Sequence, residues 1–453
     1  MSKVNSVNEP EFAAFIAIDW ADREHVWAME LPGGGQRETG KFEHTPEAIE
    51  LWAMRWATRF NGRPVAVALE QARGALLYAL RKYRHLVLYP VHPSTSHDYR
   101  KAMFPSGSKD DPKDTDLILD LLLRHRDRLR VLKPDTELTR KLQSLVEQRR
   151  QLVDERTAYT NRVNGQLKLY FPQVLRWFDK LDAPIVSAFL ERWPRLEDLQ
   201  KASSDTLRQF FFEHHSRSHS RIEERLVEVQ QAKPAILDAA VTDPAVMMVQ
   251  TFLQMLAVLR EGIQKLDKAI DQAFHAHPDY SIFESFPGAG PAMAPRLLVA
   301  FGSQRDRYAT AQDILSFSGI APVTSASGSR KWIHFRWKCP KFLRQTFHEY
   351  AGLSIQHCDW ARAFYDRQRA KGKGHHAAVR ALAFKWVRIF FRCWQSGKPY
   401  EESVYLNAKQ KRQVPQKTAT KDTQPPPSHR CAQPVKLQLK KVGDFTKLGG
   451  LMA

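Results

Sequence analysis

The sequence has few cysteines and no long apolar segment. Its four cysteines are widely spaced and include no CxxC pair, which argues against a zinc ribbon. No run of about 18 apolar residues predicts a membrane span. The opening residues, MSKVNSVNEPEF, lack the apolar core of a signal peptide. We therefore expect a cytoplasmic protein without a membrane partner.

Acidic residues are also scarce relative to basic ones. The chain has 69 Lys and Arg against 49 Asp and Glu, a formal net charge of +20. Such an excess raises the affinity for polyanions through counterion release, so we expect contact with nucleic acid. The remaining composition, 43% hydrophobic and 26% charged over 453 residues, is that of a globular protein with two or three domains.

The first 130 residues alternate between strand and helix patterns. Apolar and β-branched runs predict five strands, at 12–19, 25–31, 36–43, 64–70 and 86–92. Thr45-Pro46-Glu47 is a typical helix start and predicts a helix to about Arg59. Further helices are expected at 75–84, 95–103 and 112–126. The order β-β-β-α-β-α-β-α predicts an α/β fold, a mixed sheet covered by helices. It is similar to the ribonuclease H-like architecture, of which the junction resolvase RuvC is one example.

Strand patterns are missing from about 135 to 280, where the sequence is charged and periodic. The stretches 141–170 and 220–274 predict long amphipathic helices, paired antiparallel or as a coiled coil, with breaks at Pro184 and Pro194. Residues 281–406 are again globular and mostly helical. From 407 to 453 the composition turns to Lys, Gln, Thr and Pro, which predicts a basic, disordered tail.

Four acidic residues form a pattern that predicts a metal site. Asp19 ends the first expected strand and Glu70 the fourth, so the two carboxylates leave the same end of the sheet if these strands are neighbours. Asp111 and Asp114 lie three apart at the start of a helix and share a face. Converging carboxylates repel one another unless cations lie between them, and Mg²⁺ prefers such oxygen ligands. Two Mg²⁺ ions would steady the attacking and leaving oxygens of a phosphodiester exchange.

Structural roles also account for these residues one at a time. Asp111 precedes Pro112 and would cap its helix, where Asp114 is favourable in the first turn. Asp19 would serve as a turn residue at the end of its strand. The four together, in this strand order, favour the metal site. Asp116 falls off the face shared by the helical pair and is interpreted as structural.

A glycine turn precedes a helical pattern near residue 290. In Phe286-Pro287-Gly288-Ala289-Gly290, the two glycines would let a phosphate approach the backbone amides of a helix N-terminus, as in helix-hairpin-helix modules. A plain turn between helices explains the same residues. Gly288 and Gly290 are therefore candidate nucleic-acid contacts.

A loop of small residues at 324–329 contains three serines beside cations. A serine hydroxyl needs activation and charge neutralisation to attack phosphorus. Positive charge is supplied by Arg330, Lys331, Arg336 and Lys338. A flexible loop that binds phosphate without chemistry is the simpler interpretation of the composition, and nothing local selects among Ser325, Ser327 and Ser329. Trp332 and Trp337 flank the loop, where their rings would be able to stack on bases.

These motifs, in this order, resemble the DEDD transposases of the insertion-sequence one-hundred-ten family. These are relatives of the Piv invertases and are also called bridge-RNA-guided recombinases. The resemblance covers nearly the whole chain to about residue 406. It is carried by Ile18-Asp19-Trp20, Ala68-Leu69-Glu70, Asp111-Pro112-Lys113-Asp114, Phe286-Pro287-Gly288-Ala289-Gly290, Gly319-Ile320-Ala321-Pro322, Ser327-Gly328, Tyr365-Asp366-Arg367-Gln368-Arg369 and Gly372-Lys373.

The resemblance implies three domains: a RuvC-like domain at 1–130, a coiled-coil connector at 131–280 and a C-terminal transposase domain at 281–406. It implies an acidic tetrad at Asp19, Glu70, Asp111 and Asp114. It implies that Ser327 is the nucleophile and forms a 5′-phosphoserine link. Its implied partners are donor and target DNA, a structured non-coding guide RNA, and further copies of the chain in dimers and tetramers. The implied location is the nucleoid of a prokaryotic cell.

The leading hypothesis is therefore a phosphoryl-transferring recombinase. The runner-up is a RuvC-like nuclease or Holliday-junction resolvase that uses water as the attacking group. A third hypothesis is a nucleic-acid-binding protein without catalysis, which the basic excess supports equally well.

Overall fold

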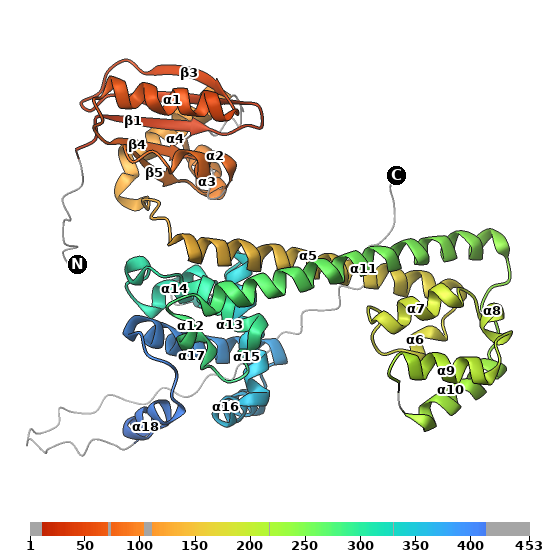
Figure 1. Cartoon of the computed structure of the whole chain (residues 1–453). Coiled ribbons are helices and arrows are strands. Elements are labelled where there is room, and N and C mark those ends of the chain that lie inside the picture. The colour runs from red at the N-terminus through yellow and green to blue at the C-terminus, as the bar shows by residue number, and fades with distance from the viewer. Residues whose placement is uncertain (1–10, 71–73, 104–110, 217, 329, 414–453) are drawn as a thin grey trace, which may run out of the picture. The chain divides into compact units, whose positions relative to one another are not determined.

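The computed structural model describes residues 11–70, 74–103, 111–216, 218–328 and 330–413, with backbone alone at 111–113, 331 and 408–413. The described residues up to Pro399 form one compact unit, and the described residues from Tyr400 form a second. Figure 1 labels the helices and strands.

The N-terminal part contains a five-stranded mixed sheet. Its strands are β1 (Ala14–Asp19), β2 (Glu24–Glu30), β3 (Glu38–Glu43), β4 (Val65–Leu69) and β5 (Leu86–Pro90), in the spatial order β3-β2-β1-β4-β5. The β1–β2 and β2–β3 pairs are antiparallel, and the β1–β4 and β4–β5 pairs are parallel. The meander followed by alternating units is the order that the sequence predicts.

Helices cover both faces of this sheet, as Figure 1 shows. On one face α1 (Pro46–Arg59) and α2 (Ala75–Leu80) bury Trp52, Trp56 and Leu80 against the sheet. On the other face α4 (Asp111–His125) buries Ile118 and Leu122. α3 (Pro93–Met103) precedes α4. As expected, Thr45 caps α1, its side chain accepting a hydrogen bond from the Ala48 amide at 3.2 Å.

Two long helices follow and run antiparallel. α5 (Glu137–Tyr170) pairs with α11 (Ala239–His275). Arg149 of α5 forms a salt bridge with Asp267 of α11. Ten residues further along α5, the ring of Tyr159 lies 5.7 Å from that of Phe252, which precedes Asp267 in α11. The two helices therefore run in opposite directions. At the other end of the pair, the imidazole of His277 lies 2.9 Å from the Thr139 hydroxyl.

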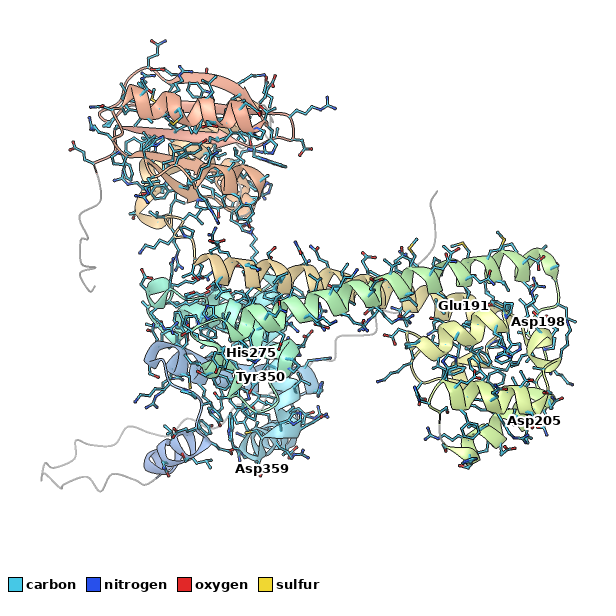
Figure 2. The ribbon with its side chains drawn as sticks, viewed as in Figure 1. Glu191, Asp198, Asp205, His275, Tyr350 and Asp359 are labelled. Atoms are coloured by element: carbon cyan, nitrogen blue, oxygen red, sulfur yellow. The ribbon has the colours of Figure 1, made fainter. Side chains whose placement is uncertain are left out.

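In the sequence, a helical bundle is inserted between the end of α5 and the start of α11. Its core gathers Trp177, Phe189, Trp193 and Phe211 with residues from the adjoining halves of α5 and α11. Glu191, Asp198 and Asp205 lie on three of its helices (Figure 2). The bundle comprises α6 (Val174–Trp177), α7 (Pro184–Arg192), α8 (Leu196–Gln200), α9 (Ser204–Glu213) and α10 (His219–Gln231).

The C-terminal part is mostly helical, as expected. Tyr350 lies in its core (Figure 2), with its hydroxyl donating to the carbonyl of Pro287 at 3.1 Å. Its described helices are α12 (Tyr280–Glu284), α13 (Gly290–Phe301), α14 (Ala311–Phe317), α15 (Lys341–His357), α16 (Asp359–Ala370) and α17 (His375–Ser396), and α18 (Glu402–Gln413) belongs to the second unit. Single 3₁₀ turns are at η1 (Arg126–Arg128) and η2 (Arg305–Arg307).

The structure corrects three expectations. The stretch 220–274 is not one helix but α10 and α11, because Lys233-Pro234 lies between them and proline disfavours helix at the preceding residue. The serine loop is a β-hairpin, made of β6 (Val323–Ser327) and β7 (Arg330–His334). The expected tail begins later, since α18 continues to Gln413; its remainder lies outside the described residues.

Among the described helices, α11 alone has the length and apolar composition of a membrane span, with a window of mean hydropathy 1.3. It carries core residues of the bundle and packs along α5, and core helices of this kind have the same length and composition.

Candidate active site and nucleic-acid interface

Asp19 and Glu70 lie at the same edge of the sheet. Asp19 is the last residue of β1, and Glu70 directly follows the last residue of β4. The parallel register pairs Ile18 with Leu69, so both acidic residues are one position beyond a matched pair. Adjacent strands are about 4.8 Å apart. The two residues are therefore neighbours at the carboxyl edge, as the sequence pattern requires.

The strand alternation also puts both residues on one face. Ile18 and Leu69 belong to the core beneath α1 and α2, whereas Ala17 and Ala68 belong to the core beneath α4. Successive side chains of a strand point to opposite faces. Positions 19 and 70 therefore project toward the face that α4 covers.

α4 brings its first turn to this same face. Asp114 is 6% exposed and lies one turn before Ile118, which packs on the sheet. Arg100 of α3 forms a salt bridge with the Asp114 carboxylate. Asp111 is the first residue of α4, and its side chain lies outside the described residues.

The donor set suits a hard divalent cation. Asp19 and Glu70 offer carboxylate oxygens from one sheet edge, and Asp114 offers another from the helix over the same face. Among the side chains that the structure describes, no three His, Cys, Asp or Glu groups are close enough to hold an ion. The side chain of Asp111 is not among those described.

Asp116 has a partner of its own. Arg37 donates to Asp116 at 3.1 Å and to Glu30 of β2 at 3.0 Å. The pKa of Arg37 is raised by these carboxylates despite its partial burial. Asp116 thus ties α4 to the sheet, in keeping with the structural role expected for it.

Ser327 lies at the tip of the β6–β7 hairpin, exposed to solvent. It faces Arg330 across the two-residue turn, and Ser325 faces Trp332 one pair further in. Gly328 begins the turn with φ +55°, a left-handed conformation that favours glycine. Directly opposed residues point to the same side of an antiparallel ribbon. Ser325, Ser327, Arg330 and Trp332 therefore share one face.

The predicted cationic contacts differ in their surroundings. Arg330 is exposed on the hairpin. Arg336 is half-buried, and its carbonyl accepts a hydrogen bond from Arg344 at 3.4 Å. Lys338 donates to Asp98 of α3 at 2.8 Å, which lowers the pKa of that carboxyl. The side chain of Lys331 lies outside the described residues.

The two glycines of the predicted phosphate turn also differ. Gly288 has φ +75°, and a Cβ there would lie 2.5 Å from the His357 ring, so packing against α15 accounts for this glycine. Gly290 begins α13 with φ +54°, and a Cβ there would meet open space. Only at Gly290 does the backbone remain open to a phosphate.

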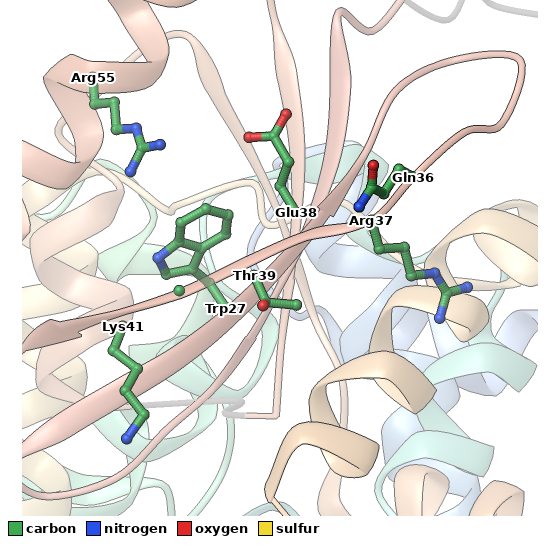
Figure 3. A pocket seen from close by; sticks show the side chains of 8 residues that line it. Trp27, Gln36, Arg37, Glu38, Thr39, Lys41 and Arg55 are labelled. Carbon is green, nitrogen blue, oxygen red and sulfur yellow. The ribbon is translucent and has the colours of Figure 1, made fainter.

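A shallow hollow lies at the β3 edge of the sheet. It has a volume of about 510 Å³ and is lined by residues of β3, by Gln36 and Arg37 directly before that strand, and by Trp27 and Arg55 (Figure 3). Trp27 projects to the α1 face, away from the carboxylates. None of Asp19, Glu70 and Asp114 lines the hollow, although Arg37 in its wall also binds Asp116 of α4.

Two features of the N-terminal domain were not expected from the sequence. Arg100 pairs with Asp114, although nothing in its local pattern distinguishes it from other helical arginines. His25 and His44 are 2.8 Å apart between ring nitrogens, and burial together with His44 lowers the pKa of His25 to about 4. Their link follows from the β2–β3 register, which pairs His25 with Phe42.

The chain thus combines a mixed sheet that has acidic residues at one edge with a mostly helical part that carries an exposed serine hairpin. Comparison with known families agrees. The model of the DEDD transposases of IS110 matches residues 16–172, from β1 through α5. The model of the transposase IS116/IS110/IS902 family matches residues 280–366, from α12 into α16.

Individual relatives extend along most of the chain. The mini-circle protein of IS117 from Streptomyces coelicolor is 28% identical over 403 residues, 87% of this chain and 97% of the relative. The insertion element IS110 protein of the same organism is 29% identical over 67% of this chain and 74% of its own. An IS116 protein from Streptomyces clavuligerus is 24% identical over 83% and 93%. The chain belongs to the IS110 family of transposases.

Proposed function

We propose that this chain is a recombinase that cleaves and rejoins DNA strands between a donor and a target, using a divalent metal and a serine nucleophile. Membership of a transposase family supports DNA cleavage and rejoining as the activity. The observation that carries the mechanism is the β1–β4 register, which brings Asp19 and Glu70 together on the face where α4 begins.

In this proposal Asp19, Glu70, Asp111 and Asp114 hold Mg²⁺, as two ions. When bound, Mg²⁺ would neutralise the negative charge that develops on the reacting phosphate. The positions of Asp19 and Glu70 at the ends of two paired strands support this assignment, because sites built on strands are more precisely held than sites on loops. Burial and Arg100 fix the carboxylate of Asp114.

Ser327 is the proposed nucleophile. Its Oγ would form a bond to the phosphorus while the bond from phosphorus to the 3′ oxygen breaks. The hydroxyl would release its proton to solvent as this bond forms, the serine would then carry the 5′-phosphate, and the leaving 3′ oxygen would take up a proton from solvent. Arg330 faces Ser327 across the turn, and its guanidinium suits the stabilisation of phosphate charge.

The partners are proposed on the family resemblance. They are donor and target DNA, a structured guide RNA encoded beside the reading frame, and further copies of the chain that form dimers and tetramers. The net charge of +20 supports binding to nucleic acids.

The test combines the full-length protein, Mg²⁺, the RNA transcribed from the flanking segment and both DNAs. We expect a covalent protein–DNA band on a denaturing gel. Ser327→Ala should abolish that band, and Ser325→Ala, a change on the same hairpin face, should retain it. Asp19→Asn and Glu70→Gln should abolish both cleavage and adduct.

Other outcomes would select the rival functions. Undiminished adduct in Ser327→Ala would exclude this serine as the nucleophile. Hydrolysed ends without any adduct in the unaltered protein would favour a RuvC-like nuclease or junction resolvase. Full biological effect in Asp19→Asn, without Mg²⁺-dependent cleavage, would favour a protein that only binds nucleic acid.

A further inference from the structure

Trp332 is a large aromatic side chain left open on the hairpin that carries Ser327. Its side chain is 45% exposed, and it makes no ring or cation–π contact within the described part of the chain. Trp337 is 79% exposed but differs in its surroundings. Its ring lies 4.9 Å from that of Phe335, which in turn lies under the guanidinium of Arg344.

The strand register places Trp332 beside the proposed chemistry. Trp332 is paired with Ser325, one pair inward from Ser327 and Arg330 on the same face of the ribbon. Diagonal neighbours on one face have Cα atoms about 7–8 Å apart, within the reach of an indole ring. Ile333, the next residue, points to the opposite face with Thr324.

The charge around the hairpin favours a polyanion. From Ile314 to His348 the sequence contains no acidic residue, whereas Lys and Arg occur at positions 330, 331, 336, 338, 341 and 344. One side of this narrow ribbon therefore presents a cation, a hydroxyl and an open aromatic face. The cation suits the phosphate of a nucleotide, the hydroxyl can attack that phosphate, and the aromatic face suits the base.

We propose that Trp332 is a positioning residue that stacks on an unpaired DNA base next to the phosphodiester that Ser327 attacks, while Arg330 binds the phosphate. This inference rests on the proposed function, because the bound strand is taken to be the DNA that Ser327 attacks. The stacked base fixes the register of the strand on the hairpin, so that a single linkage faces the hydroxyl.

The experiment measures binding apart from chemistry. The full-length protein is titrated, without Mg²⁺, into a 20-nucleotide single-stranded DNA of mixed sequence labelled with fluorescein. Base–aromatic stacking is worth about 1–3 kcal/mol, and 1.4 kcal/mol is a tenfold change in affinity. Trp332→Ala should therefore weaken binding by about 5-fold to about 140-fold. Trp332→Phe should lose less than Trp332→Leu, because phenylalanine keeps an aromatic face.

Ile333→Ala is the matched control on the other face of the ribbon and should change the affinity less than about twofold, the effect expected of a side chain that stacks on no base. Equal affinities for the unaltered protein and Trp332→Ala, or equal losses in Trp332→Ala and Ile333→Ala, would overturn the inference. So would tighter binding of the RNA of the same sequence that depends on Trp332, since the strand would then not be DNA.

The covalent-adduct assay separates this inference from the proposed function. An unaltered protein that binds DNA through Trp332 yet forms no adduct would contradict the serine chemistry and leave the stacking intact. An adduct formed equally well by the unaltered protein and Trp332→Ala, at DNA concentrations below saturation, would support the chemistry and contradict the positioning role.

Discussion

Arg100 holds the buried carboxylate of Asp114 at the first turn of α4. A buried charge that loses its partner destabilises the fold by about 3 kcal/mol. We therefore expect Arg100→Ala to lower the melting temperature of the full-length protein in the absence of Mg²⁺. Because a bound cation stabilises the folded state, millimolar MgCl₂ should raise the melting temperature of the variant more than that of the unaltered protein.

The control for this prediction is Arg124→Ala. Arg124, an exposed residue of the same helix, pairs with Asp120, which also accepts from Tyr99. Loss of Arg124 should therefore cost less than about 1 kcal/mol and confer no Mg²⁺ dependence. Equal responses of all three proteins to Mg²⁺ would argue against a metal at Asp114.

A second prediction concerns the contact between Gly40 and Trp27. A Cβ at Gly40 would lie 2.6 Å from Cζ2 of the buried Trp27, which packs edge-on against Trp56. Gly40→Ala should therefore destabilise the N-terminal domain by about 1–3 kcal/mol through overpacking. Gly165, an interior residue of α5 near its C-terminal end, has open space at its Cβ position, so Gly165→Ala should stabilise the protein by up to about 1 kcal/mol. Calorimetric melting distinguishes the two, and a stable Gly40→Ala variant would show that Trp27 can move aside.

A third prediction concerns the ion network that joins α5 to the C-terminal helices. Glu349 of α15 accepts from Arg296 of α13 at 2.5 Å and from Arg150 of α5 at 3.4 Å. Arg296 is 8% exposed. Glu349→Gln keeps the shape but leaves the buried Arg296 without its anion, while Arg150 retains Asp154. We therefore expect a loss of about 3 kcal/mol in unfolding free energy. Asp154→Asn removes only the exposed partner of Arg150 and should cost less than about 1 kcal/mol. Similar losses in both variants would contradict the importance of burial here.

A fourth prediction concerns acid stability. Burial and His44 lower the pKa of His25 to about 4, whereas an unfolded histidine has a pKa of about 6.5. Between these values the unfolded state binds more protons, so stability falls as the pH drops from 6.5 toward 4. The loss from this residue should reach about 3 kcal/mol. In His25→Phe, the melting temperature should decline less steeply over that range, and above pH 7 the two curves should run parallel. Equally steep declines would assign the acid sensitivity to other groups.

The sheet could be predicted from the sequence because its signals are local. Thr45 and Pro46 begin α1 as expected, and the apolar runs become β1 and β4. The joint position of Asp19 and Glu70 could also be predicted, since parallel neighbours end at one edge. The partner of Asp114 could not, because Arg100 reaches it from another helix.

The serine segment shows a different limit. Its small polar residues have little side-chain pattern, so the sequence predicts a loop. The strands form because the turn at Gly328 permits close pairing of Ser327 with Arg330. The register, and with it the common face of Ser327 and Trp332, follows from that turn and not from hydrophobic alternation.

The antiparallel arrangement of α5 and α11 has a consequence for the helical bundle that is inserted between them in the sequence. The chain departs near Thr139 and returns at His277, where the two side chains are in hydrogen-bond contact. The segment from 171 to 238 is therefore a folded insertion with the topology of a loop. Its size can grow, shrink or be exchanged at the far end without shifting the residues that meet at the near end.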